Sequence, residues 1–237
     1  MRLNKFISST GLCSRRKADD LIAQGKVVVN GEVATLGLAV DDRDVVEVDG
    51  KVLVQKKEEE VYIALNKPPG ITSTTEQHID GNIVDFINHD QRIFPIGRLD
   101  KESEGLILLT SDGNIVNEIL REENNHEKDY IVMVNKEITP SFIEGMSDGV
   151  EIYNPVKNEY TTTKKCKVLQ LNNRSFKITL SQGLNRQIRR MCTQFDYQVY
   201  KLQRVRVAHI TLKGLELGQW RNLTEDEVQK FKHARNN

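Results

Sequence analysis

An acidic loop between two apolar segments is the first place in this sequence where chemistry could occur. Residues 97–105 read Gly-Arg-Leu-Asp-Lys-Glu-Ser-Glu-Gly, and the apolar run 106–110 follows directly. A loop held by a rigid strand is a common position for a catalytic side chain. A carboxylate such as Asp100 could act there as a nucleophile or as a general base. Most loops of this kind are plain turns, so the loop alone identifies no reaction.

A second chemically suggestive segment covers residues 180–195, where arginines accompany an apolar stripe. A strand is expected to end near Leu180, and a helix should follow Gly183, which allows a turn. The stripe has the i, i+3, i+4, i+7 spacing of a buried helix face at Ile188, Met191, Cys192 and Phe195. This stripe by itself is typical of any amphipathic surface helix.

The arginines of this helix point to a more specific role. Arg189 lies roughly 60° from Cys192 at about 100° per residue, so it can turn inward and pair with a carboxylate in a cleft. Arg186 and Arg190 lie on the opposite face, where they can contact a phosphate group. An ordinary surface helix explains poorly why these three arginines fall within five positions and have no acidic partner at i+4.

The charge distribution is compatible with a nucleic-acid partner although the formal net charge is zero. Nine Lys and Arg residues stand against one Asp between positions 174 and 213, and six stand against two acidic residues between positions 1 and 31. The compensating acidic residues gather elsewhere, notably within 100–129. Segregated charge can give a neutral protein a positive face, whereas solvated helix faces would give the same composition. Composition leaves both interpretations open.

Length and composition limit the class of protein. A chain of 237 residues suffices for one ordinary domain with a small appended unit. No apolar run approaches the roughly 20 residues that span a bilayer, and the basic segment 1–17 lacks the apolar core of a signal peptide. The three cysteines, which are Cys13, Cys166 and Cys192, are scattered and odd in number, which favours a reducing compartment. We therefore expect the protein to be located in the cytoplasm. Scattered histidines and the lack of a Cys-x-x-Cys pair argue against a metal site.

Residues 1–49 are expected to form a small first unit with two helices and a short sheet. The second helix should begin at the N-cap residue Ser14 and end before Gly25. Valine-rich runs at 27–29 and 45–48 predict strands, and Asn30-Gly31 is a strong hairpin-turn signal. So few elements give a marginal core, which is typical of an attached binding module.

Three cations, Arg15, Arg16 and Lys17, occupy the first turn of that helix, where the helix dipole disfavours positive charge. They either lie near an anion or are simply solvated. The unit resembles the S4 RNA-binding domain in the run 2–5, in Ser14-Arg15-Arg16-Lys17-Ala18-Asp19, and from Gly25 to Gly31. This resemblance covers nearly the whole unit. It implies that these cations bind RNA and that the unit carries no catalytic group.

A charged segment, 50–60, is expected to link this unit to a larger domain over 61–237. Helical patterns such as 115–120 fall between β-rich runs in the larger part, and these runs are 61–65, 106–110, 130–134, 166–171 and 176–180. Because strands and helices do not alternate regularly, we predict an α+β class with a mixed or largely antiparallel sheet.

Four segments of the larger domain resemble, in the right order, the motifs of the pseudouridine synthases. They are Lys67-Pro68-Pro69-Gly70, Gly97-Arg98-Leu99-Asp100 with Gly105-Leu106, Glu127-Lys128-Asp129-Tyr130, and the arginine-rich run 183–191. These four motifs follow an S4-like unit. Together they are most similar to the RsuA/RluB/RluE/RluF group of ribosomal RNA enzymes, and within that group to the RluF type. One departure is Leu184, where many relatives have Arg, and it bears on one RNA contact rather than on the chemistry.

The resemblance implies a role for each matched residue. Asp100 would be the essential carboxylate, and Arg189 its ion-pair partner, which would keep it ionised at neutral pH. Tyr130 would lie against the target base and could help to move its C5 proton, while Leu180 would form an apolar wall. Arg98 would hold the RNA open where the uridine leaves the stack. Phosphate contacts would fall to Arg186 and Arg190.

An enzyme of this family isomerises uridine in RNA by breaking the N1–C1′ bond and making a C5–C1′ bond. No electrons or groups are gained, so the resemblance implies neither a cofactor nor a metal. The expected substrate is large-subunit ribosomal RNA, with transfer RNA as an alternative, and the expected state is a monomer without membrane attachment. The carboxylate could attack the sugar or the base, or deprotonate C2′, and the sequence leaves this order open.

A different class of function also fits an S4-like unit joined to such a domain. A non-catalytic RNA-binding factor of ribosome assembly would keep the fold while its active site decayed. Such a protein would be free to lose Asp100, Tyr130 or Arg189, and all three are present. This observation favours the enzyme.

Overall fold

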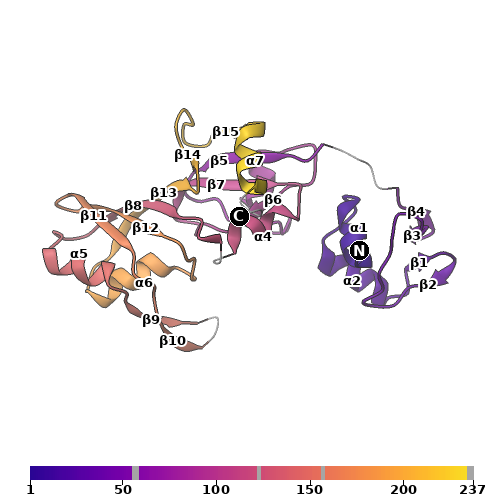
Figure 1. Cartoon of the computed structure of the whole chain (residues 1–237), viewed down its shortest axis with the longest axis horizontal. Helices are drawn as coiled ribbons and strands as arrows, with labels where there is room; N and C mark the ends of the chain where they lie inside the picture. The colour runs from indigo at the N-terminus through magenta and orange to yellow at the C-terminus, as the bar shows by residue number, and fades with distance from the viewer. Residues whose placement is uncertain (55–58, 122–123, 156–157, 234–237) are drawn as a thin grey trace. The chain divides into compact units, whose positions relative to one another are not determined.

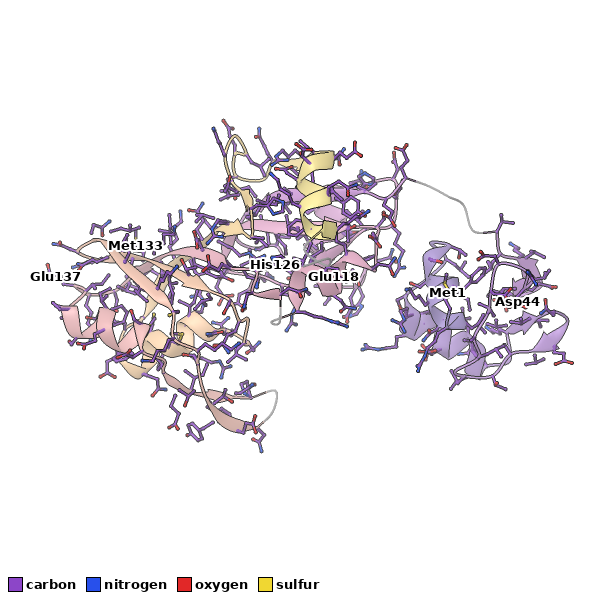
Figure 2. All side chains as sticks on the ribbon, in the orientation of Figure 1. Met1, Asp44, Glu118, His126, Met133 and Glu137 are labelled. Atoms are coloured by element: carbon purple, nitrogen blue, oxygen red, sulfur yellow. The ribbon has the colours of Figure 1, made fainter. Side chains whose placement is uncertain are left out.

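The computed structural model of the chain describes residues 1–54, 59–121, 124–155 and 158–233. The chain divides into two compact units, Met1–Glu60 and Val61–Asn237 (Figure 1; described side chains in Figure 2). Part of the predicted linker 50–60, namely 55–58, lies outside the described residues. Another part of it, Lys51–Val52, forms a short strand of the first unit and so is not plain linker.

The first unit contains α1 (Leu3–Ser9), α2 (Arg15–Ala23) and a sheet of strand order β2-β1-β3-β4. Its strands are β1 (Val27–Val29), β2 (Glu32–Val33), β3 (Val46–Val48) and β4 (Lys51–Val52). The Ser14 hydroxyl accepts from the backbone N–H of Lys17 at 3.2 Å, which confirms the predicted N-cap. Asn30 and Gly31 have φ values of +53° and +85° and connect β1 to β2, so the predicted hairpin turn is also confirmed.

The second unit is built on a mixed sheet of order β11-β12-β8-β13-β7-β5-β15, with β14 paired to β13 and β6 paired to β7 (Figure 1). Its strands are β5 (Tyr62–Lys67), β6 (Phe94–Ile96), β7 (Glu104–Thr110), β8 (Lys128–Val134), β11 (Lys167–Asn172), β12 (Ser175–Leu180), β13 (Val199–Val207), β14 (Ile210–Thr211) and β15 (Trp220–Asn222). Strands β13 and β7 run parallel, and the other neighbours along this order run antiparallel. The predicted α+β class with a mixed sheet is therefore confirmed.

Helices cover both faces of the central strands. The helices are α3 (Ile83–Ile87), α4 (Ile115–Leu120), α5 (Pro140–Ser147), α6 (Gln187–Gln194) and α7 (Glu225–His233), and a separate hairpin is formed by β9 (Glu151–Asn154) and β10 (Glu159–Thr162). Ile107 and Leu109 of β7 join one core with α3, α5 and α6, whereas Leu106 and Leu108 join a second core with α4 and α7. A strand covered on both faces reads as a continuous apolar run, which is why the sequence indicated β7 clearly.

The start of β7 approaches β13 very closely. Gly105 has a φ of +106°, and a Cβ placed on it would lie 2.2 Å from the carbonyl oxygen of Arg204. A side chain therefore cannot be accommodated at this position without moving the parallel pair. This glycine brings residues 97–103 up against the strands that complete the site.

Candidate active site

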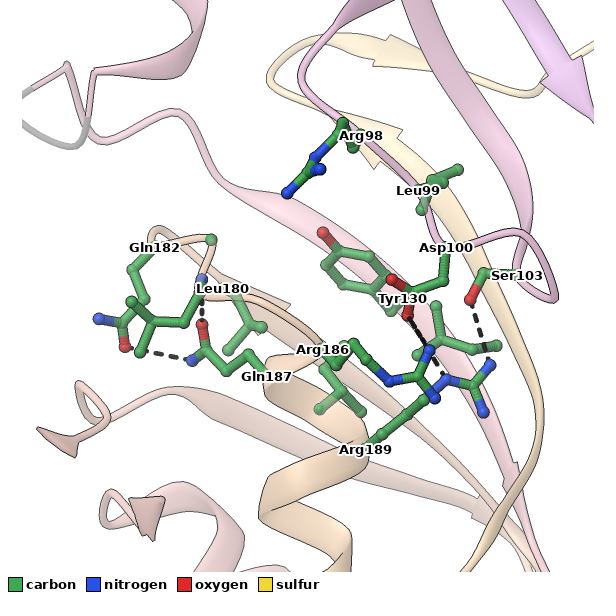
Figure 3. A pocket seen from close by; sticks show the side chains of 14 residues that line it. Arg98, Leu99, Asp100, Ser103, Tyr130, Leu180, Gln182, Arg186, Gln187 and Arg189 are labelled. Carbon is green, nitrogen blue, oxygen red and sulfur yellow. Dashed lines mark hydrogen bonds and ion pairs between the residues drawn. The ribbon is translucent and has the colours of Figure 1, made fainter. Parts of the chain in front are cut away.

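A pocket in the second unit collects most of the residues that the sequence singled out (Figure 3). Loop 97–103 contributes Asp100 and Arg98 to its lining, β8 contributes Tyr130, and the end of β12 contributes Leu180. The remaining lining residues include Leu99, Ser103, Gln182, Gly183, Leu184, Arg186, Gln187, Ile188, Arg189 and Leu202. Segments that are far apart in the sequence thus meet around one carboxylate.

The loop that carries Asp100 is held in place by backbone and hydroxyl contacts. The backbone N–H of Ser103 donates to the Asp100 carbonyl at 3.0 Å and closes a turn around the carboxylate. The buried Ser73 hydroxyl donates to the Leu99 carbonyl at 2.8 Å and accepts from the Leu99 N–H at 3.2 Å. The Gly70 N–H donates to the carbonyl of Lys101 at 2.7 Å. The loop is therefore fixed on both sides of Asp100.

Lys67 explains why the Lys-Pro-Pro-Gly segment accompanies this loop. The lysine is fully buried at the end of β5, and its Nζ donates to the carbonyls of Pro68 and Ile71, each at 2.9 Å. A third contact at 3.4 Å reaches the Lys101 carbonyl in the loop. Burial lowers the pKa of this ammonium group to about 8, although the nearby Asp100 carboxylate favours its charged form. Lys67 thus connects the turn after β5 to the loop that carries Asp100.

Two arginines face Asp100 from the other side of the pocket. Arg186 Nη1 lies 3.5 Å and Arg189 Nε 3.6 Å from the same oxygen, Asp100 Oδ2 (Figure 3). The Asp100 side chain keeps 27% of its surface exposed, so it is accessible from the pocket while paired. A carboxylate that is paired with guanidinium groups and open to the pocket can act as a nucleophile toward an electrophilic carbon.

Arg189 is the more firmly positioned of the two arginines. Its Nη1 donates to the carbonyl of Val199 at 3.2 Å, and its Nη2 donates to the hydroxyl of Ser103, also at 3.2 Å. Its side chain is only 14% exposed. Its buried Nε makes no hydrogen bond within the described part of the chain and points at the carboxylates of Asp100 and Glu102, both 3.6 Å away. The inward turn expected from the helical angle is what the structure has.

Tyr130 is fixed by an ionic cluster on its neighbour. The carboxylate of buried Asp129 accepts from Arg206 at 2.7 and 2.8 Å and from the Thr179 hydroxyl at 2.8 Å, and Lys177 lies 2.7 Å away. Burial raises the pKa of Asp129, but the hydrogen bonds from Arg206, Lys177 and Thr179 outweigh it and hold that pKa far below its usual range. This cluster locks β8, β12 and β13 together. The adjacent Tyr130, itself 9% exposed, is therefore held at the pocket wall.

The other cations singled out from the sequence lie elsewhere. Arg190 Nη1 donates to the Tyr153 carbonyl at 2.6 Å, and its Nη2 donates to Asn185 Oδ1 at 3.0 Å, so this arginine ties the β9–β10 hairpin to α6. The expectation that Arg190 faces a phosphate gains no support from these contacts. Arg15, Arg16 and Lys17 are exposed in the first turn of α2, in the other unit.

Sequence reasoning gave no role to Glu102, Ser103 or Lys67, although all three stand inside or beside the motifs. The local sequence around these residues gives little indication of a role in the site. Glu102 is a second carboxylate two positions after Asp100, and Lys67 is a cation at the end of an apolar strand. Their contacts depend on distant segments, 34 positions away for Lys67 and 84 for Glu102.

Comparison with known proteins identifies the kind of enzyme that this site belongs to. The family model for RNA pseudouridylate synthase matches residues 61–194, and the model for the S4 domain matches residues 1–46. The chain is 56% identical over 229 residues to dual-specificity RNA pseudouridine synthase RluF of Escherichia coli (strain K12), which covers 96% of this chain and 77% of that protein. The chain belongs to the RNA pseudouridine synthase family.

Two further similarities agree with this assignment. Ribosomal large subunit pseudouridine synthase B of Bacillus subtilis (strain 168) is 37% identical over 238 residues, which is 98% of this chain and 95% of that protein. A crystal structure of a pseudouridylate synthase superimposes with a TM-score of 0.70 at 27% identity and covers 98% of this chain and 99% of that one. The family and the RluF-type resemblance expected from the motifs are thereby confirmed, and this pseudouridine synthase acts on RNA.

Within the part of the chain that the structure describes, no helix has both the length and the apolar character needed to cross a membrane.

Proposed function

We propose that this pseudouridine synthase isomerises a uridine of large-subunit ribosomal RNA, with Asp100 as the catalytic carboxylate. The observation that carries the proposal is the pocket itself. A partly exposed carboxylate lies between Arg186 and Arg189 and shares a pocket with an aromatic ring, Tyr130, and an apolar wall, Leu180.

The pocket suits a base that has left its stack. Uracil is flat, with polar edges and an apolar face, so it can lie on the ring of Tyr130 and against Leu180 while its edges meet polar groups. Arg98 is exposed at the pocket and is available to hold the RNA where the nucleotide leaves the helix. A flipped uridine of this kind would bring its C1′ and C5 within reach of Asp100.

The paired carboxylate is suited to each route open to it. Attack on C1′ or on the base requires an anion, and removal of a proton from C2′ requires a base. Arg189 holds the carboxylate by ion pairing and is itself anchored to Val199 and Ser103. Tyr130 lines the same pocket as Asp100, and in this proposal its hydroxyl helps to move the C5 proton after the new C–C bond has formed. We therefore propose Asp100, Arg189 and Tyr130 as the catalytic group.

The first unit supplies affinity and placement in this proposal. Arg15, Arg16 and Lys17 are exposed on α2, and a phosphate there would offset their unfavourable position in its first turn. We propose an RNA-binding unit that extends from residue 1 through β4, Lys51–Val52, and a catalytic domain over 61–237. We further propose that the enzyme is a monomer in the cytoplasm, in accord with the reduced state of Cys13, Cys166 and Cys192.

We propose large-subunit RNA as the substrate because the Bacillus subtilis relative is named as a pseudouridine synthase of the large ribosomal subunit. Transfer RNA is a second candidate, since the Escherichia coli relative is called dual-specificity. The deciding experiment maps pseudouridines in ribosomal and transfer RNA from cells with and without this protein. It then repeats the modification in vitro with the purified enzyme and unmodified transcripts. An unchanged map of ribosomal RNA would refute the large-subunit proposal, and a change in transfer RNA alone would favour the second candidate.

A further inference from the structure

A second carboxylate shares the arginines of Asp100. Glu102 Oε1 accepts a short hydrogen bond from Arg186 Nη1, the atom that also lies 3.5 Å from Asp100, and it is 3.6 Å from Arg189 Nε. Two carboxylates and two guanidinium groups thus form a closed, electrically balanced group. The Glu102 side chain is 46% exposed and that of Arg186 is 41% exposed, so this pair faces solvent.

Glu102 is held as an anion in this group. Burial raises its pKa, but a backbone hydrogen bond and the guanidinium of Arg186 outweigh this effect, so the pKa of Glu102 lies below its ordinary value. Arg186 is therefore already neutralised before any RNA arrives. An approaching phosphate would add a third anion to two guanidinium groups and would compete with Glu102 for the donors of Arg186.

The two carboxylates differ in how easily their side chains can move away from Arg186. Asp100 is confined by the turn to Ser103 and by the Ser73 contacts around Leu99. Glu102 has a longer side chain, is nearly half exposed, and can rotate into water. Arg186 precedes α6 in the left-handed region, with a φ of +50°, and its side chain is likewise partly free. Glu102 is thus the anion that can be released at least cost.

We propose that Glu102 is a positioning residue that occupies Arg186 in place of an RNA phosphate and is displaced when the substrate backbone binds. The inference rests on the proposed function, because it needs an RNA at this pocket. The consequence of this exchange is that the enzyme distinguishes correctly placed RNA from RNA that is placed wrongly. RNA whose backbone is not placed to take Arg186 must leave the internal pair intact and meets the negative charge of Glu102. Correctly placed RNA exchanges one ion pair for another.

A simpler explanation must be separated from this one. Any acidic side chain near the pocket repels RNA through its field, whether or not it touches Arg186. The two explanations differ in whether the effect of Glu102 on RNA affinity depends on Arg186. Displacement requires Arg186 as the shared partner, so the effect of Glu102 on affinity must vanish when Arg186 is absent. Field repulsion must persist.

The experiment is a double-mutant cycle on RNA binding, with Glu102→Gln, Arg186→Gln and the double variant in the full-length chain. The probe is an unmodified large-subunit ribosomal RNA transcript at fixed salt, and Kd is measured by filter retention. We expect Glu102→Gln to tighten binding about fivefold with Arg186 present and by less than about 1.5-fold in the Arg186→Gln background. The matched control Glu151→Gln, which removes an exposed charge on β9, should change Kd less than about twofold.

Equal tightening in both backgrounds would overturn the proposal in favour of simple repulsion. Unchanged or weaker binding by Glu102→Gln would overturn it as well, provided that thermal melts show folded proteins. A purely structural role predicts a lower melting temperature without coupling to Arg186. Wild-type protein that binds the transcript but forms no pseudouridine on it would refute the proposed function instead. The two failures are distinguishable because the cycle is read from binding alone.

Discussion

Replacement of Asp100 by Asn tests the reaction most directly. The substitution keeps the size of the side chain and most of its hydrogen-bonding capacity, but removes the negative charge and the reactive oxygen. If this carboxylate does the chemistry, the single-turnover rate at saturating RNA should fall by at least about 10⁴-fold, as is usual when a catalytic nucleophile is removed. RNA binding should stay the same or improve, because a negative charge leaves the vicinity of phosphates.

The structure also sets how much stability this variant should lose. Two unit charges about 4 Å apart attract by roughly 4 kcal/mol at an effective dielectric constant near 20, but pairs this exposed to water usually contribute only about 0–1 kcal/mol net. Glu102 remains beside Arg186 and Arg189 after the substitution, so neither guanidinium is left without an anion. We therefore expect a loss below about 1 kcal/mol, or a melting temperature lower by no more than about 4 °C.

The assay combines pseudouridine formation, a binding titration and a thermal melt on the same preparations. Asp148→Asn is the matched control, since it removes an exposed Asp paired with Lys165 away from the pocket and should retain full activity. Pseudouridine formation by folded Asp100→Asn at more than a trace rate would refute the assigned mechanism. A melting temperature lowered by 10 °C or more would instead refute the reasoning about Glu102, because it would mean that the arginines depend on Asp100 alone.

Other parts of the structure lead to further predictions. Tyr130→Phe should keep RNA affinity within about twofold yet lower turnover by about 10²-fold or more if its hydroxyl helps to move the C5 proton, and near-normal turnover would reduce Tyr130 to packing. Asp129→Asn should lower the free energy of unfolding at pH 7 by about 3 kcal/mol, the low end for a broken buried ion pair, because Arg206 keeps Glu127 as a second partner. The pKa of Asp129 is depressed in the folded state, so its stabilisation is complete above about pH 4 and is lost as the pH falls through the folded value. Chemical denaturation should therefore show the two proteins converging at acid pH, and a constant difference would contradict the assignment. Removing Met1–Glu60 should weaken RNA binding at least about tenfold while a single-turnover rate remains measurable at saturation, and a folded but wholly inactive remainder would place part of the active site in that unit.

The fold was predictable wherever a strand or helix carries its own signal. The apolar run 106–110 indicated β7, and the N-cap Ser14 marked the start of α2. The true start of β7 is Glu104, two residues earlier, because Glu104 and Gly105 pair with β13 in the parallel register. No local pattern reveals that partner, since its own residues lie far along the chain.

The site was predictable to the extent that it follows from motifs and helical angles. Asp100 and Tyr130 came from the resemblance, and the inward turn of Arg189 followed from its place beside the apolar stripe of α6. Arg190 could not be placed in this way, because its partner is the Tyr153 carbonyl, 37 positions away. The sharing of Arg186 by Asp100 and Glu102 arises only when α6 closes over the loop. Tertiary closure of this kind leaves no periodic trace in a sequence.

The close approach of β7 and β13 has a consequence for how the protein acquires its activity during synthesis. Arg204 Nε donates to the carbonyl of Leu106, which lies 98 positions earlier in the chain. Contacts between such distant residues require closure of a long loop and form slowly compared with local hairpins. During synthesis, the start of β7, which follows the loop of Asp100, must therefore wait for nearly a hundred further residues before its neighbouring strand exists. A nascent chain of this enzyme therefore carries Asp100 early, but its pocket is complete only when β13 has emerged.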